Sequence, residues 1–193
     1  MNNPEYVKIG DKKYKINTDF RVALKCNKVA QDTSISDIER AMAIIYLLYG
    51  DEGLDNTQDH EQLLRLATKY LGLGKEIEKT NEEPDMDFEQ DMDYIETSFM
   101  SDYGIDLSTT NMHWWKFYNL INGLSNSEMG NCCVLNRVRN LRRFDASTIK
   151  DPKERKKIIE AQKMVALKKN EPKLTKEQEQ SVMEIIKLAG LDK

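Results

Sequence analysis

The sequence predicts a mainly α-helical protein: a multi-helix bundle of about seven or eight helices with a small β-hairpin at its N-terminus. Two observations carry this prediction. Apolar residues recur at intervals of three and four along most of the chain, which is the period of an amphipathic helix. In addition, the 193 residues include only nine glycines and four prolines, a composition that favours long helices with short connections.

The first element expected is a β-hairpin over residues 6–16. Val7 and Ile9 alternate with polar neighbours, a Gly-Asp turn follows, and Tyr14 and Ile16 resume the alternation. An isolated two-stranded hairpin is only marginally stable in water, so we expect it to lie on the helices or to pair with another strand. Its free edge could then serve as an oligomer contact.

Three helices should complete the N-terminal half. Thr18 is the expected N-cap of a helix over about 19–31, and a second helix should run from Ser34 or Ser36 to about Leu48. A third should extend over about 59–71 and end at a pair of glycines. The second has the most apolar stripe in the chain, and we interpret it as a central core helix. That stripe consists of Ile38, Ala41, Met42, Ile45, Leu48 and Tyr49.

An acidic and polar segment that contains a proline, residues 75–87, is the expected linker. It divides the chain into a hairpin plus helical domain, residues 1–74, and a helical C-terminal part, residues 88–193. The C-terminal part should open with a helical hairpin, followed by basic helices.

The helical hairpin consists of two amphipathic helices joined by a glycine-containing loop. The first has Phe88, Met92, Ile95 and Phe99 on one face, and the second has Trp114, Phe117, Tyr118, Ile121 and Leu124. Three further helices are expected at 127–143, from Pro152 to about Lys169 with Asp151 as N-cap, and from Thr175 to Gly190. The helix that starts at Pro152 should turn Ile158, Ala161, Met164, Val165 and Leu167 inward.

Two adjacent tryptophans are the first candidates for an interaction site. A helix cannot bury both Trp114 and Trp115 on one narrow stripe, so one should lie in the core with Phe117 or Tyr118. The other should lie at the flank, either in a seam between helices or as an exposed anchor for a partner. We interpret His113 as a polar residue at the start of this helix rather than as a catalytic base.

Charge is distributed unevenly, although the net charge is only -4. Residues 76–102 contain eleven acids and one base, whereas residues 137–169 contain twelve bases and four acids. The two stretches could attract each other, within one chain or between copies. Alternatively, the basic stretch could hold an anionic partner, with Arg139, Arg142 and Arg143 as the candidate contacts.

No pattern typical of catalysis or of metal binding is found. Glycine-rich phosphate loops are absent, and the two histidines lie far apart without metal-ligand spacing. Cys132 and Cys133 are adjacent on a predicted helix and should point to different faces. The odd number of cysteines and the lack of a long apolar run indicate a reducing compartment and no membrane span. We therefore expect a non-enzymatic protein without metal or cofactor.

Three segments resemble a known family. The sequence SFMSDYGIDL at 98–107, followed by MHWWKF at 112–117 and Leu120–Leu124, is similar to siphophage proteins from phages and prophages of Gram-positive bacteria. These proteins are encoded in the tail module, near the major tail protein and the tape measure. The triplet Asp19-Phe20-Arg21 and the arginine-rich helix after the tryptophans fit the same pattern. The resemblance covers most of the chain.

By gene position and size, that family is similar to tail assembly chaperones, which coat the long apolar tape-measure helix before the tail tube polymerises. The resemblance implies a non-enzymatic chaperone or adaptor in the cytoplasm of the bacterial host. It would bind tape-measure and tail-tube proteins through helix faces, could form homo-oligomers, and has no catalytic residues to carry over. Two alternatives stay open: a structural tail or head–tail component of the virion, and a nucleic-acid-binding helical protein that uses residues 137–169.

Overall fold

The computed structural model describes residues 3–75, 83–126 and 132–168. Within these residues lie seven α-helices, two 3-10 helices and one two-stranded antiparallel sheet at the N-terminus. The predicted mainly α-helical fold with a small N-terminal hairpin is therefore confirmed. No helix in the described ranges is long and apolar enough to cross a membrane.

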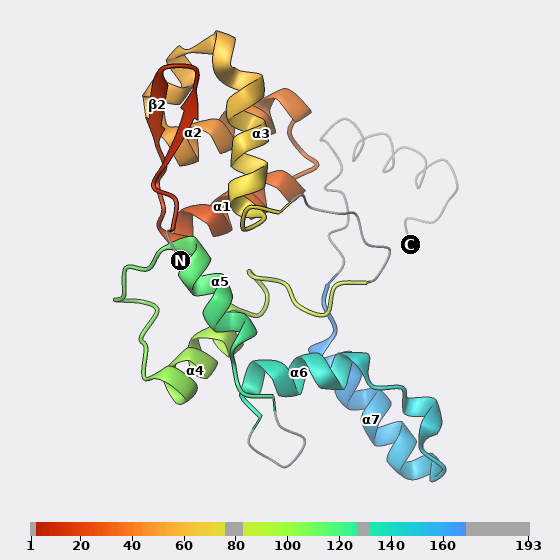
Figure 1. The fold of residues 1–193 in the computed structure, drawn as a ribbon. Helices are drawn as coiled ribbons and strands as arrows, with labels where there is room; N and C mark the ends of the chain where they lie inside the picture. The colour runs from red at the N-terminus through yellow and green to blue at the C-terminus, as the bar shows by residue number, and fades with distance from the viewer. Residues whose placement is uncertain (1–2, 76–82, 127–131, 169–193) are drawn as a thin grey trace, which may run out of the picture.

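The N-terminal half packs the hairpin against a group of helices (Figure 1). In the hairpin, Val7 lies opposite Tyr14 and both turn toward the helices. Tyr14 is buried, and its hydroxyl donates to a carboxylate oxygen of Asp59 at 2.5 Å, which fixes the hairpin on the helices. The elements of this half are β1 (Tyr6–Ile9), β2 (Lys12–Lys15), α1 (Phe20–Gln31), α2 (Asp37–Asp55), η1 (Thr57–Asp59) and α3 (His60–Leu71).

The N-caps of α1 and α2 follow local hydrogen-bonding chemistry. The prediction of Thr18 as the cap of α1 was wrong: the Asp19 carboxylate accepts from the backbone N–H of Arg21 at 2.8 Å. Of the two serines considered for α2, Ser36 is the cap, and it forms a capping box with Glu39. A carboxylate satisfies an orphan helix donor at least as well as a threonine hydroxyl.

Helix α2 is interrupted at Gly50, close to the end predicted near Leu48. Gly50 adopts a φ of +67° and a ψ of -159°, a non-helical conformation that glycine reaches at little cost, and a second helical piece follows as far as Asp55. Next to this kink, the carbonyl of Leu48 accepts from the backbone N–H of Asn17 at 2.7 Å. The chain that leaves the hairpin is thereby attached to the middle of α2. Ile38, predicted to lie in the core, is instead 75% exposed.

The C-terminal half departs from the prediction at its helix ends. Phe88 lies in a turn before α4, and the two cysteines precede α6, with Cys133 as its N-cap. Helix α7 ends at Val165, and Met164 is 86% exposed rather than inward. The helix expected at 175–190 lies outside the described residues. The elements are α4 (Met92–Tyr103), α5 (Trp114–Asn122), α6 (Val134–Arg143), η2 (Ala146–Thr148) and α7 (Pro152–Val165).

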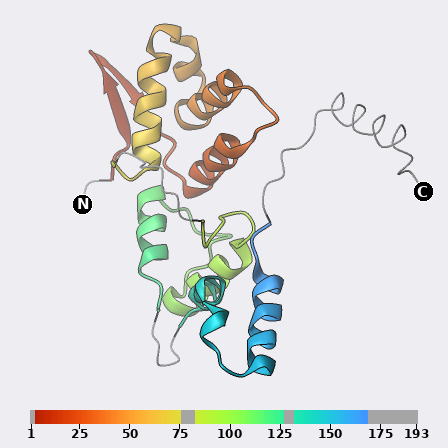
Figure 2. The same cartoon turned by 90° about the vertical axis from the view of Figure 1, so that its right-hand side faces the viewer.

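One hydrophobic core joins the two halves. The buried cluster contains Tyr14, Phe20 and Leu63 from before the acidic segment, and Phe117 and Leu135 from after it. The rings of Phe20 and Phe117 stack with centroids 4.4 Å apart. Figure 2 shows α5 directly below α3 at the centre of the molecule, where the halves meet.

Candidate functional site

Three stretches of the chain come together at one place, which we call the joint (residues 18–21, 103–107 and 112–117). The last two belong to segments that carry the family resemblance, and the first includes the triplet Asp19-Phe20-Arg21, which fits the same pattern. Asp19 and His113 form an isolated antiparallel bridge. The backbone N–H of Phe20 donates to the carbonyl of Met112 at 2.9 Å, and that of Trp114 donates to the carbonyl of Thr18 at 2.8 Å. These two bonds connect the start of α1 to the start of α5, so the joint fixes how the halves are oriented.

Arg21 holds the loop that leads into α5. Its Nη2 donates to the carbonyls of Leu107 at 2.5 Å and Thr110 at 3.1 Å. The Asp19 carboxylate accepts from Nη1 of the same guanidinium at 3.2 Å, which orients it toward the loop. The triplet Asp19-Phe20-Arg21 thus supplies a helix cap, a core ring and a loop clamp in consecutive residues.

The Tyr-Gly-Ile part of the motif closes α4. Gly104 has a φ of +64°, and its backbone N–H donates to the carbonyl of Met100 at 3.0 Å, as in the αL C-cap motif. Tyr103 donates its hydroxyl to the carbonyl of Leu120 at 2.9 Å. This bond ties the end of α4 to the end of α5.

The two tryptophans reach across to the end of α3. Trp114 is buried and its Nε1 donates to the carbonyl of Leu71 at 3.1 Å. Trp115 is half-buried, donates from Nε1 to the carbonyl of Tyr70 at 2.9 Å, and stacks on that tyrosine ring. The structure places Phe117 in the core and Tyr118 half-buried beside Trp114. The four aromatic candidates therefore form the seam between the halves.

His113 is the N-cap of α5. Its Nδ1 accepts from the backbone N–H of Trp115 at 3.0 Å, and its Nε2 lies 3.1 Å from the carbonyl of Pro4. Nδ1 must therefore be the unprotonated nitrogen, and Nε2–H is the donor to Pro4. This arrangement confirms that His113 is a polar residue at a helix start, and both ring nitrogens are engaged.

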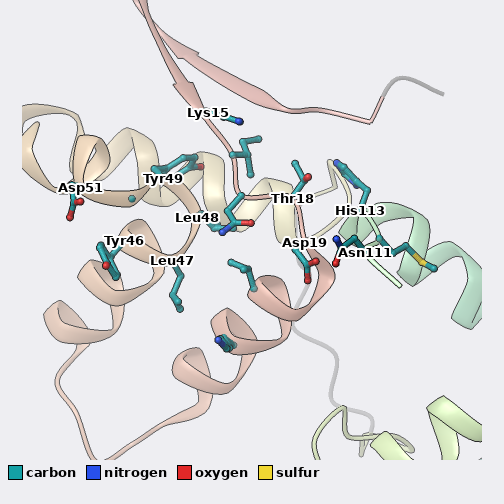
Figure 3. Close-up of a pocket in the computed structure, with 16 residues that line it drawn as sticks. Lys15, Thr18, Asp19, Tyr46, Leu47, Leu48, Tyr49, Asp51, Asn111 and His113 are labelled. Atoms are coloured by element: carbon teal, nitrogen blue, oxygen red, sulfur yellow. The ribbon is translucent and has the colours of Figure 1, made fainter. Parts of the chain in front are cut away.

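A groove of about 900 Å³ lies over the joint on the side of α1 and α2. Figure 3 shows that its labelled side chains come from three parts of the chain. These are the end of the hairpin and the residues after it, from Lys15 to Asp19, the α2 residues from Tyr46 to Asp51, and Asn111 and His113 before α5. Asp19 and His113 are already engaged as helix caps. Among the described residues, no group of three or more His, Cys, Asp or Glu side chains could hold a metal ion.

The arginines of α6 face the acidic stretch, residues 76–102, of the same chain. Arg142 forms a bidentate pair with Asp91, with N–O distances of 2.6 and 2.7 Å, and Asp91 has no exposed surface. Nη1 of Arg142 also donates to the carbonyl of Asp85 at 2.8 Å, and Nε of Arg142 donates to the carbonyl of Val165 at 2.6 Å. The hydrogen bond to the Asp91 carboxylate raises the pKa of Arg142.

The other two arginine candidates meet at one carboxylate. Arg139 donates to Asp85 at 3.0 Å, and Arg143 forms an ion pair with the same side chain. The acidic and basic stretches therefore attract each other within the chain, the first of the two interpretations of the charge pattern. Of the three arginines, only Arg143 keeps most of its side chain exposed, at 62%.

Helix α7 is held mainly by polar contacts, and none of its residues is fully buried. The Gln162 side chain donates to the carbonyls of Leu141 and Phe144, at 3.0 and 2.6 Å. Beyond the helix, the Gln90 amide makes two hydrogen bonds with the backbone of Lys168, at 2.8 and 3.1 Å. A groove of about 910 Å³ separates α7 from the acidic segment. The sequence did not single out Asp85, Gln90 or Asp91 from the many polar residues around them.

The fold and the joint define a mainly helical protein whose motif residues connect two halves. A family model described as bacteriophage Gp15 protein matches residues 2–167, and the chain belongs to that family. The expected membership of a phage protein family is thereby confirmed. No curated protein and no solved structure matches the chain.

Proposed function

We propose that this protein is a non-enzymatic tail assembly chaperone or adaptor of siphophages of Gram-positive bacteria, acting in the host cytoplasm. Membership of a phage family supports the proposal, as do the tail-module resemblance of the joint residues and the predominance of helices. Its partners would be the tape-measure and tail-tube proteins. The single observation that carries the binding role is the apolar surface of α2.

Helix α2 has more apolar surface than the core covers. Ile45 and Leu48 are buried at 1% exposure, whereas Ile38 is 75% and Tyr46 is 49% exposed. Met42 is half-buried and lies four residues after Ile38 and four residues before Tyr46. Ile38, Met42 and Tyr46 therefore form one apolar outer edge of α2 at helical spacing. A surface helix normally presents polar residues on its solvent side, so an apolar outer edge marks a contact surface.

The chemistry of this edge fits the apolar face of another helix. Two aliphatic side chains and one tyrosine spaced by four residues can pack along an amphipathic helix, in the manner of helix-in-groove recognition. The aromatic and arginine residues first considered for this role are mostly engaged inside the molecule. The outer edge of α2 is therefore the proposed contact for a tape-measure helix.

Co-expression with the neighbouring tail proteins, followed by pull-down, tests this function. We expect the wild-type chain to retain tape-measure segments, and the double variant Ile38→Glu/Tyr46→Glu to lose them. Met164→Glu is the matched control, because Met164 is 86% exposed on α7 and should tolerate the change. Retention by the double variant would refute the α2 contact, and no retention by the wild type would refute the chaperone role.

Two alternative functions have separate tests. Mass spectrometry of purified virions distinguishes a chaperone, which should be absent, from a structural tail or head–tail component, which should be present. Nucleic-acid binding through residues 137–169 would require salt-sensitive affinity. The internal pairing of Arg139 and Arg142 leaves fewer free cations for it than the sequence suggested.

A further inference from the structure

The outer face of the hairpin carries uncompensated positive charge. In the register of the two strands, Lys8 lies directly opposite Lys13, and Tyr6 lies opposite Lys15. All four side chains are exposed, and Lys13 Nζ lies 3.8 Å from the centroid of the Tyr6 ring. The opposite face holds the residues that pack on the helices. This outer face, Tyr6, Lys8, Lys13 and Lys15, is called the basic face below.

Such a face is unfavourable in an isolated molecule. Like charges placed directly opposite on neighbouring strands repel each other and weaken the hairpin. No carboxylate forms an ion pair with Lys8, Lys13 or Lys15 anywhere in the described part of the chain. An anionic surface placed over the hairpin would remove this repulsion, so the basic face is suited to an acidic partner.

Helix α4 presents the complementary surface. Asp93, Glu96 and Met100 are exposed at helical spacing along one side, and the sequence of α4 contains no basic residue. Within the described residues, neither carboxylate has an ion-pair partner. We call this side of α4 the acidic face. Met100 is 50% exposed, comparable with Tyr6 at 42%.

The charges on the two faces have similar spacing. Cross-strand neighbours such as Lys8 and Lys13 have Cβ atoms about 5 Å apart. Residues three apart on a helix, such as Asp93 and Glu96, have Cβ atoms about 5–6 Å apart. Two lysines can therefore pair with two carboxylates at once. The exposed Tyr6 side chain lies beside the lysines on the basic face, and the exposed Met100 side chain lies beside the carboxylates on the acidic face.

We propose that the basic face of one copy binds the acidic face of α4 in a second copy, so that the chain associates head to tail. Both views show the hairpin in the upper half of the molecule and α4 in the lower half, so one copy can make both contacts (Figures 1 and 2). A contact between two different surfaces is heterologous, and it produces a ring or an open row of copies. Because the contact is small and charged, the association is weak and salt-sensitive.

Sedimentation velocity of the full-length chain with charge-reversed variants tests this contact. At about 50 mM salt the wild type should self-associate with rising concentration, and at about 500 mM salt it should be monomeric. Lys8→Glu/Lys13→Glu and Asp93→Lys/Glu96→Lys should each weaken self-association by about tenfold or more. An equimolar mixture of the two should restore it, because each reversed face then meets its complement.

A matched control changes the same amount of charge elsewhere. Lys153→Glu/Lys157→Glu lies on the exposed side of α7 and should leave self-association unchanged. Circular dichroism establishes that every variant is folded. A monomeric wild type at low salt, or failure of the mixture to associate, would overturn the proposal.

The Ile38→Glu/Tyr46→Glu variant separates this inference from the proposed function. It should lose tape-measure binding and keep self-association, because α2 contributes to neither the basic face nor the acidic face.

Discussion

The guanidinium of Arg142 contacts the Asp91 carboxylate and the backbone carbonyls of Asp85 and Val165, so it connects the acidic stretch, residues 76–102, to the end of α7. Its neighbour Arg143 makes one ion pair and is largely solvated. The sequence predicts a basic helix but cannot rank its arginines, because both residues have the same chemistry. The two arginines differ in burial and in partners because Asp91, which precedes α4 in the sequence, lies next to Arg142 of α6 only in the folded chain.

This contrast predicts unequal effects of two arginine substitutions. Arg142→Ala leaves the buried Asp91 carboxylate without its partner, so we expect it to lower the free energy of unfolding by about 3–5 kcal/mol. Arg143→Ala should change it by less than about 1 kcal/mol, because the Arg143 side chain is 62% exposed and Asp85 keeps Arg139 as its other partner. Urea unfolding followed by tryptophan fluorescence measures both. Equal effects would mean that the Arg142–Asp91 pair does not stabilise the fold.

A second residue-scale prediction concerns Gly123 and Tyr103. A Cβ added at Gly123 would lie 2.9 Å from the Tyr103 hydroxyl oxygen, which bonds to Leu120. Gly123→Ala should therefore destabilise the protein by about 1–2 kcal/mol through overpacking and the lost hydrogen bond.

Tyr103→Phe removes the clashing oxygen, so the same glycine substitution should cost less in that background. A double-mutant cycle by urea unfolding measures the coupling between the two positions. If the effects of Gly123→Ala and Tyr103→Phe on stability are additive, the close approach of Tyr103 is not the reason that position 123 requires glycine.

At the scale of elements, helical periodicity predicted which segments are helices but not where several of them end. Phe88 fits the stripe of α4 by spacing, yet it lies in the preceding turn and packs its ring near Trp114. The apolar stripe of α2 gave no sign that Ile38 is outside the core. Periodicity reports which side chains share a face, and tertiary packing decides how much of that face is covered.

The joint illustrates the same limit. Spacing alone predicted that one tryptophan is in the core and the other at a flank, and the structure has Trp114 and Trp115 in these positions. It did not predict that both indoles donate to carbonyls at the end of α3. Those bonds connect residues more than forty positions apart, and no local pattern encodes them.

The attachment of α7 leads to a prediction about local opening. No residue of α7 is fully buried, whereas Leu63 and Ala67 of α3 have no exposed surface. Helices with few buried contacts open at lower free energy. Hydrogen–deuterium exchange should therefore be faster throughout α7 than in α3. Equal protection of the two helices would contradict the view that α7 is held mainly by polar contacts.

At the scale of the whole molecule, the continuous core predicts cooperative unfolding. Leu63 in α3 and Leu135 in α6 are fully buried in one cluster. Leu63→Ala and Leu135→Ala should each lower the midpoint of a single thermal transition, with a loss of about 2–5 kcal/mol in stability. Calorimetry distinguishes this from two independent halves, in which each substitution would shift only its own transition.

The interior of the N-terminal half also predicts sensitivity to alkali. Burial raises the pKa of Cys26 to about 12 from 9.0, and burial with the Asp59 hydrogen bond raises that of Tyr14 to about 12 from 10.0. Burial likewise raises the pKa values of Tyr49 and Tyr70. In the unfolded chain these groups lose their protons first. Their stabilising contribution is therefore complete below about pH 9 and is lost as the pH rises toward 12.

The melting temperature should accordingly fall between pH 9 and pH 11, as measured by circular dichroism. Tyr70 is a suitable position for substitution, because its hydroxyl is buried without a hydrogen-bond partner among the described residues. Tyr70→Phe removes one raised pKa and one unpaired polar group, so the variant should be at least as stable at pH 8 and should lose less stability in alkali. Tyr6→Phe, on the exposed face of the hairpin, is the matched control and should follow the wild type. A Tyr70→Phe variant with the alkaline profile of the wild type would show that this hydroxyl ionises equally easily in the folded and unfolded chain.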